Sequence, residues 1–277
     1  MVFVIQNSMV HPPILLVLLL FLSGCATTYS SYVNPLEGNS NAYSTIPLKS
    51  DSLKLATYAS ALVTIGGSNS LNDLLFSFHG NIHKSHNWGI VQGYYGAGIA
   101  LGSYRFYENL PYSNFSLNRV TPKYFGAYGI NGGLNLVLNF NTFEWRAIGL
   151  ETSVVNEFGK YLSFRKSQAD SNLSVLETNG LLRSLGGTTE FLWKRKSGMV
   201  VGYKIAIGGF FIPDHNFRGM ENFQKPLYFS NSIHLTKGNL TGFWQFNFGS
   251  YNNTFQMGVN YQLRKRTLKN SIGHNQK

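Results

Sequence analysis

The chain has 277 residues and a net charge of +11, but only 13% of its residues are charged while 15% are aromatic. Soluble domains carry about 25% charged residues, so this composition excludes an ordinary charged surface that faces water on all sides. A disulfide framework is also excluded, because Cys25 is the single cysteine. Stability must therefore come from packing or from a membrane.

The N-terminus carries an apolar run at residues 13–21, too short to span a bilayer and about as long as the hydrophobic region of a signal peptide. The run is followed by Leu22, Ser23, Gly24 and Cys25. This tetrapeptide resembles the lipobox of bacterial lipoprotein precursors. The resemblance implies that residues 1–24 are a cleaved signal peptide and that a diacylglyceryl group on Cys25 attaches the mature chain to membrane lipid. The alternative is a buried cysteine in a core helix.

The next segment, residues 26–52, is rich in Ser, Thr, Asn, Tyr and Pro and has no sustained hydrophobic period. Such a composition is typical of a linker, so residues 25–52 are predicted to be the lipidated cysteine and a flexible tether. Lipoproteins kept in the inner membrane carry an aspartate directly after the cysteine. Ala26 stands there instead, so the resemblance implies the outer membrane of a Gram-negative cell.

From residue 53 onward the dominant hydrophobic period is two, which indicates β-strands. Between residues 124 and 140, for example, Ile130, Leu134 and Leu136 fall on one face while Asn131 and Asn135 fall on the other. About ten strands are predicted, at residues 53–65, 74–83, 92–105, 124–140, 147–154, 188–196, 199–208, 227–236, 241–250 and 255–264.

The predicted connections alternate between short and long. Short ones fall at residues 83–88, 141–142, 197–198 and 237–239, and long polar ones at 106–122, 164–184 and 211–226. This alternation is typical of an antiparallel up-and-down outer-membrane barrel. We therefore expect an all-β barrel over residues 53–266, followed by a basic tail at 267–277. An even strand count would return both ends of the chain to the periplasmic, short-turn side.

The polar face of the strands consists mainly of Gly, Ala, Ser, Asn and Gln, which suits a confined lumen better than a surface in water. The apolar face is therefore predicted to point outward, toward lipid. The few charged residues on the polar face are predicted to form an ion-paired network that fills a narrow lumen. They are Glu151, Glu190, Lys194 and Lys204. The alternative is a soluble, lipid-anchored barrel with an apolar interior that binds a hydrophobic ligand.

Histidines offer only weak signs of a metal site. His79 and His83 share a strand face, with His86 in the following turn, but residues four apart in a strand are about 13 Å apart. That separation is too large for one ion, so these side chains are expected to be polar residues of the lumen and the turn. No metal site and no cofactor are predicted.

Two weak sets could suggest catalysis. Asp214 and His215 lie in a long loop, and Ser232 and His234 share a strand face. The latter would be the candidate pair if the barrel were an enzyme acting on envelope lipids. Neither set comes with a recognised hydrolase motif, so no catalytic residue is assigned.

Basic clusters at residues 194–196 and 264–266 fall on the predicted short-turn side, where they could contact anionic headgroups. A nucleic-acid partner is not expected, because the predicted export signal takes the chain away from nucleic acid. Residues 13–25 and the strand pattern together resemble the lipid-anchored outer-membrane β-barrels of Gram-negative bacteria. The resemblance implies a non-enzymatic envelope protein with a structural, surface-interaction or narrow-pore role.

Overall fold

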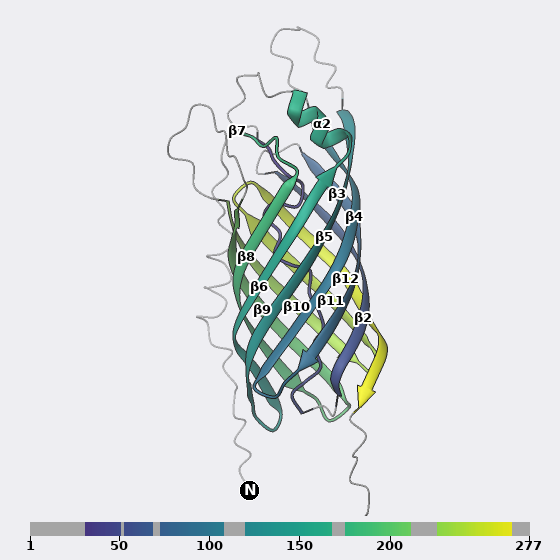
Figure 1. The fold of residues 1–277 in the computed structure, drawn as a ribbon, viewed down its shortest axis with the longest axis vertical. Coiled ribbons are helices and arrows are strands. Elements are labelled where there is room, and N and C mark those ends of the chain that lie inside the picture. The colour runs from purple at the N-terminus through teal and green to yellow at the C-terminus, as the bar shows by residue number, and fades with distance from the viewer. Residues whose placement is uncertain are drawn as a thin grey trace, which may run out of the picture.

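A computed structural model of the chain describes residues 31–50, 53–68, 73–107, 120–167, 175–211 and 226–267. Ten antiparallel strands close into a barrel (Figure 1), which confirms the predicted all-β class and the strand count. The barrel strands are β2 (Leu53–Ser68), β3 (Leu74–Asn87), β4 (Val91–Tyr107), β5 (Val120–Asn139), β6 (Phe143–Phe158), β8 (Leu181–Lys194), β9 (Met199–Phe211), β10 (Leu227–Lys237), β11 (Leu240–Gly249) and β12 (Asn252–Thr267).

Each barrel strand pairs with its neighbour in the chain, and β2 pairs with β12 to close the barrel. Three small elements lie outside this wall. They are α2 (Lys160–Ser167) and the parallel pair of β1 (Ser31–Tyr32) with β7 (Val175–Leu176). Within the described ranges, no helix has the length and hydropathy needed to cross a bilayer.

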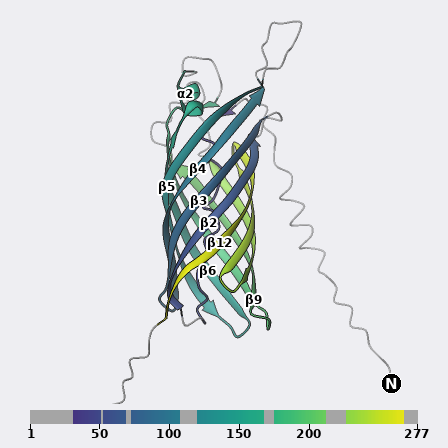
Figure 2. The ribbon, with the colours of Figure 1, turned by 90° about the vertical axis from the view of Figure 1, so that its right-hand side faces the viewer.

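The two ends of the barrel differ, as the alternating connections predict. At one end, here called the short-turn end, residues 88–90, 140–142, 195–198 and 238–239 join the strands. Gly89, Gly198 and Gly238 have positive φ there, a conformation that tight turns require and that glycine adopts without strain. α2 lies at the opposite, long-loop end (Figure 2), where β7 also lies and where the longer intervals of sequence between strands fall.

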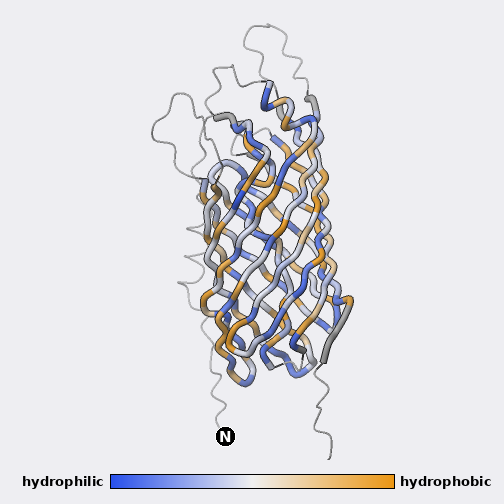
Figure 3. Tube along the Cα trace, viewed as in Figure 1, coloured by the Kyte–Doolittle hydropathy of each residue, from blue (hydrophilic) through white to orange (hydrophobic). Residues whose placement is uncertain are grey.

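The apolar face of the strands points outward. Ile130 is 63% exposed and Leu134 is 54% exposed, whereas Ala127 and Asn135 on the alternate face are buried. Figure 3 shows this alternation of hydrophobic and hydrophilic residues along the strands. Buried polar side chains dominate the interior. The structure therefore lacks, over its described residues, the apolar interior that a soluble barrel for hydrophobic ligands would need.

The segment before β2 corrects one prediction. Residues 33–50, here called the lumen segment, run inside the barrel, and most of them are buried. The flexible tether predicted at residues 26–52 is therefore wrong over this stretch. Its Asn, Ser and Thr side chains favour a polar lumen as much as they favour water, so composition alone could not separate a linker from a plug.

The path of the lumen segment also separates the two ends of the described chain. β1 pairs with β7 at the long-loop end, whereas Thr267 pairs with Leu53 at the short-turn end. The prediction that both ends leave the barrel on one side is wrong for these residues. Cys25 and the rest of the lipobox lie outside the described residues, as does the tail beyond Thr267.

Candidate functional site

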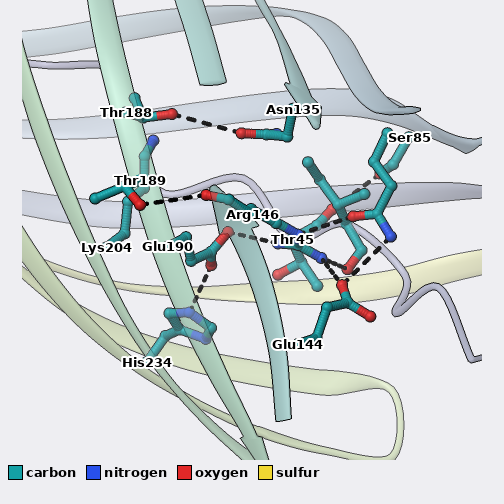
Figure 4. A network of polar contacts seen from close by, with 12 residues as sticks. Thr45, Ser85, Asn135, Glu144, Arg146, Thr188, Thr189, Glu190, Lys204 and His234 are labelled. Carbon is teal, nitrogen blue, oxygen red and sulfur yellow. Dashed lines mark hydrogen bonds and ion pairs between the residues drawn. The ribbon is translucent and has the colours of Figure 1, made fainter. Parts of the chain in front are cut away.

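The centre of the filled lumen is a buried ionic cluster around Arg146 of β6 (Figure 4). One guanidinium nitrogen, Nη1, lies 2.6 Å from Oε2 of Glu190, and Nη2 lies 3.5 Å from Oε1 of Glu144. Nε donates to Oε1 of Gln92 at 2.8 Å. The Arg146 side chain is fully buried, so its charge is stabilised by these wall residues rather than by water.

His234 of β10 extends the cluster along the wall, two strands from Glu190 of β8. Its Nε2 lies 2.8 Å from Oε1 of Glu190, and the ring of Tyr43, from the lumen segment, stacks on the imidazole with the centroids 4.0 Å apart. Gly202 of β9 stands opposite His234 in the ladder. A Cβ added at Gly202 would overlap the imidazole, so a glycine is what makes room for this histidine.

The Gly202→Ala variant should therefore lose stability. Forcing a methyl group into a packed interior costs about 1–3 kcal/mol, and here the group it meets is the imidazole that binds Glu190. Urea unfolding in detergent, followed by the gel shift of the folded barrel, measures the loss. Gly242→Ala is the matched control, because a Cβ there meets nothing within 4 Å. Equal stability of the two variants would contradict the packing described.

Of the four charged residues predicted to form a lumen network, three are buried in the lumen. Nζ of Lys204 donates to Oε2 of Glu151 at 2.6 Å, while Glu190 binds Arg146 and His234. Lys194 lies apart at the short-turn end, where its Nζ donates to Ser50 Oγ at 2.8 Å and to Asn139 Oδ1 at 3.0 Å.

The sequence pattern missed Arg146 because of a β-bulge. In β6, Arg146 pairs with Val137 and Ile148 with Leu136, so Ala147 is an extra residue. An extra residue moves every later side chain to the other face. A strict period of two, extended back from Ile148, would place Arg146 among the lipid-facing residues.

Wall side chains also bind the backbone of the lumen segment. Arg146 Nη2 donates to the carbonyl oxygen of Ile46 at 2.9 Å, and Ser85 Oγ donates to that of Thr45 at 2.9 Å. Similar bonds reach the backbone along most of the segment. Side-chain amides of the wall donate to further backbone carbonyls of the segment: Asn252 to Asn34 and Glu37, Gln245 to Asn41, Asn260 to Tyr43, and Asn87 to Leu48. In the other direction, the backbone N–H of Lys49 donates to the Glu144 carboxylate. The irregular chain is thus satisfied without a strand of its own.

A second ionic cluster holds the beginning of the lumen segment at the long-loop end. Arg165 of α2 pairs with Glu157, and its Nη1 lies 3.5 Å from Oε2 of Glu177. The same Glu177 oxygen accepts a hydrogen bond from the backbone N–H of Asn34 at 2.8 Å. Burial raises the pKa of the Glu177 carboxyl, and the Arg165 guanidinium opposes that rise. Ion pairs and a hydrogen bond through Glu177 therefore connect α2, the residues after β7 and the start of the lumen segment.

The space left in the lumen is uneven. A cavity of about 590 Å³ opens at the short-turn end, between Pro47, Arg195 and Thr236. Toward the long-loop end, a smaller cavity of about 120 Å³ adjoins Asn39 and Gln256. Between them, the cavity beside Tyr43 has only about 10 Å³, about the minimum that one water molecule needs. Little free space therefore remains beside the central cluster.

The histidines considered as metal ligands have separate partners. Nε2 of His79 lies 2.8 Å from Ser77 Oγ, His83 Nε2 donates to the Thr45 carbonyl at 3.1 Å, and His86 stacks on an outward tryptophan. Over the described part of the chain, no three His, Cys, Asp or Glu side chains gather in a way that could hold a metal ion.

The weak catalytic candidates are not assembled into an open site. Ser232 and His234 are buried, the imidazole Nε2 binds Glu190, and Tyr43 covers the ring. A substrate would have to displace the lumen segment to reach them. Asp214 and His215 lie outside the described residues.

No protein-family model and no curated protein sequence matches the chain. Similar solved structures include the beta domain of the Bordetella autotransporter BrkA, with 13% identity and a TM-score of 0.39 over 76% of this chain and 100% of that one. Another is the outer membrane protein OprG from Pseudomonas aeruginosa, with 10% identity and a TM-score of 0.37 over 79% and 100%. Likeness of this size carries no inference about function, which must come from the residues.

Proposed function

We propose that the protein is a lipid-anchored β-barrel that spans the outer membrane, is closed by its own lumen segment, and has a structural or surface-interaction role. The proposal has three parts, which rest on different observations. The outward apolar surface supports the membrane span, the filled lumen supports a closed barrel, and the lipobox-like tetrapeptide ending at Cys25 supports the anchor.

The apolar surface carries the proposal. Large hydrophobic side chains are exposed on strands all around the barrel, at 66% for Ile148, 60% for Ile99 and 63% for Ile207. Soluble monomers rarely expose contiguous apolar patches larger than a few hundred Å². A closed barrel leaves no unpaired strand edge, which is the condition for a β-structure inside hydrocarbon.

Aromatic side chains mark both ends of this apolar surface. Toward the short-turn end, Trp88, Phe140 and Trp193 are exposed, and toward the long-loop end, Tyr124 and Phe158. Trp and Tyr are enriched where a bilayer meets water, because one part of the ring system is apolar and another is polar. Their positions favour a membrane that covers the strands between them.

The filled lumen favours a closed barrel over an open pore or an enzyme. The cavity beside Tyr43 is far smaller than the lumen cavities toward either end, which supports a lumen closed at the level of Arg146 and Tyr43. Long connections on a rigid scaffold are common interaction sites. The long-loop end is therefore the surface that we assign to contacts outside the cell.

The Cys25→Ala variant tests the proposal. We expect it to remain in the outer membrane through a carbonate wash, because the barrel itself is embedded. Radiolabelled palmitate should label the wild-type chain and not the variant. If the variant is washed off, the lipid was the only anchor and the membrane span is wrong. If the wild-type chain takes up no palmitate, the anchor is wrong while the span survives.

A further inference from the structure

We infer that this barrel is threaded by its own chain, so that the acylated N-terminus emerges at the long-loop end and its lipid enters the outer leaflet. The inference rests on the proposed function for the lipid and for the membrane. It adds the side of the membrane on which the N-terminus emerges, which follows from the path of the lumen segment. This side is opposite to the periplasmic position of the N-terminus that an even strand count suggests.

The start of the described chain is fixed at the long-loop end. The carbonyl oxygen of Tyr32 accepts a hydrogen bond from the N–H of Glu177 at 3.0 Å, and its ring meets Phe164 edge-on with the centroids 5.5 Å apart. Tyr32 and Phe164 pack against a buried apolar cluster at this end, made of Leu75, Tyr104, Phe125 and Tyr161. Residues 31–32 are therefore part of the long-loop end.

From there the lumen segment descends steadily through the barrel. Along β12, which runs toward the short-turn end, Asn252 binds the carbonyl oxygen of Asn34 and Asn260 binds that of Tyr43. At the short-turn end, Asn87, the last residue of β3, binds the carbonyl oxygen of Leu48. Successive residues thus meet successive levels of the wall, and the chain enters β2 at the opposite end.

The covalent chain then limits where the lipid can be. Six residues lead from Cys25 to Ser31, and an extended chain spans at most about 3.6 Å per residue, or about 22 Å here. β2 has 16 residues; at about 3.3 Å each and a tilt of about 40°, it rises about 40 Å along the barrel. Cys25 cannot return to the short-turn end, and long loops of outer-membrane barrels face outside the cell.

Threading also sets the order of assembly. The lumen segment leads directly into β2, and β2 forms the closing seam with β12. If the barrel closed first, the acyl chains on Cys25 would have to cross a bore lined by polar side chains, at a cost of about 0.8 kcal/mol for each CH₂ group taken out of the membrane. The segment must therefore lie in place before the last strand pairs, so that the barrel closes around it.

Protease accessibility on intact cells tests the direction. One protease site with an epitope is inserted between Thr27 and Thr28, a second between Asn216 and Phe217 in a long loop, and a third between Gly238 and Asn239 in a short turn. We expect the first two to be cut in intact cells and the third only after the outer membrane is permeabilised. Heat-modifiable gel migration confirms that each tagged chain has folded.

Each outcome is decisive. If the long-loop site is cut in intact cells but the N-terminal site is protected, the threading inference is wrong and the proposed function stands. If only the short-turn site is cut, the barrel is inverted and the outer-leaflet assignment is wrong. If carbonate releases the chain, the proposed function itself fails. A second test uses the cysteine-free Cys25→Ala chain: a short bifunctional thiol cross-linker should join Thr45→Cys to Asn260→Cys, because the native side chains are in contact, with Oγ1 and Nδ2 3.0 Å apart. Failure to cross-link contradicts a threaded lumen.

Discussion

A chain that begins at residue 51 and is refolded in detergent should form discrete ion-conducting pores in planar bilayers, whereas the chain that begins at residue 26 should show none. The wall strands pair with one another and not with the lumen segment, so the barrel can close without it. Water can then fill a bore lined by Gln92, Asn135, Gln245 and Asn260, which are buried now. Ions need only such a continuous polar path.

Comparing the conductance of these two chains isolates the effect of the lumen segment. Heat-modifiable migration must show that both refolded chains are closed barrels before conductance is compared. A full-length chain in which residues 212–221 are replaced by a Gly-Ser stretch serves as the matched control, since it alters the sequence outside the lumen segment. Equal conductance of the shortened and the longer chain would show that the lumen segment does not close the barrel.

The strand pattern was predictable because the two faces of each strand meet such different surroundings. All ten predicted strands correspond to barrel strands, from β2 to β12. The largest error is at β8, predicted to begin at residue 188 although it begins at Leu181. There, near the rim, Leu182 points inward and packs with Phe210 and Tyr228, while Arg183 points outward. This reverses the polar-inside pattern from which the strand was predicted.

The contents of the lumen were less predictable. Glu151 and Lys204 could be placed by period two alone, since Glu151 follows the bulge in the same stretch as Ile148, and the pairing of β9 shows no register shift. Arg146 could not, because the extra residue Ala147 reverses the face. The lumen segment has no period to detect, because it is irregular and many of its backbone groups bind separate wall side chains. Its position follows only from long-range contacts, such as that of Asn252 with Asn34.

Removal of the central guanidinium should destabilise the barrel strongly. In the Arg146→Met variant, Glu144 and Glu190 lose their buried cationic partner, and the carbonyl of Ile46 loses a donor. Breaking a buried ion pair on one side costs about 3–5 kcal/mol, because the other charge remains uncompensated. Urea unfolding in detergent should show the loss. Arg195→Met, at an exposed arginine of a short turn, is the matched control and should change little.

A double variant separates the unpaired charge from the other effects of the substitution. Arg146→Met combined with Glu190→Gln removes both members of the closest pair, so much of the lost stability should return, as expected where the penalty comes from an uncompensated carboxylate. His234 keeps a partner in this variant, because a glutamine amide oxygen can still accept from Nε2. If the double variant is as unstable as Arg146→Met, the arginine acts mainly by binding the lumen segment at Ile46. In that case Arg146→Met alone should also loosen the plug and raise conductance.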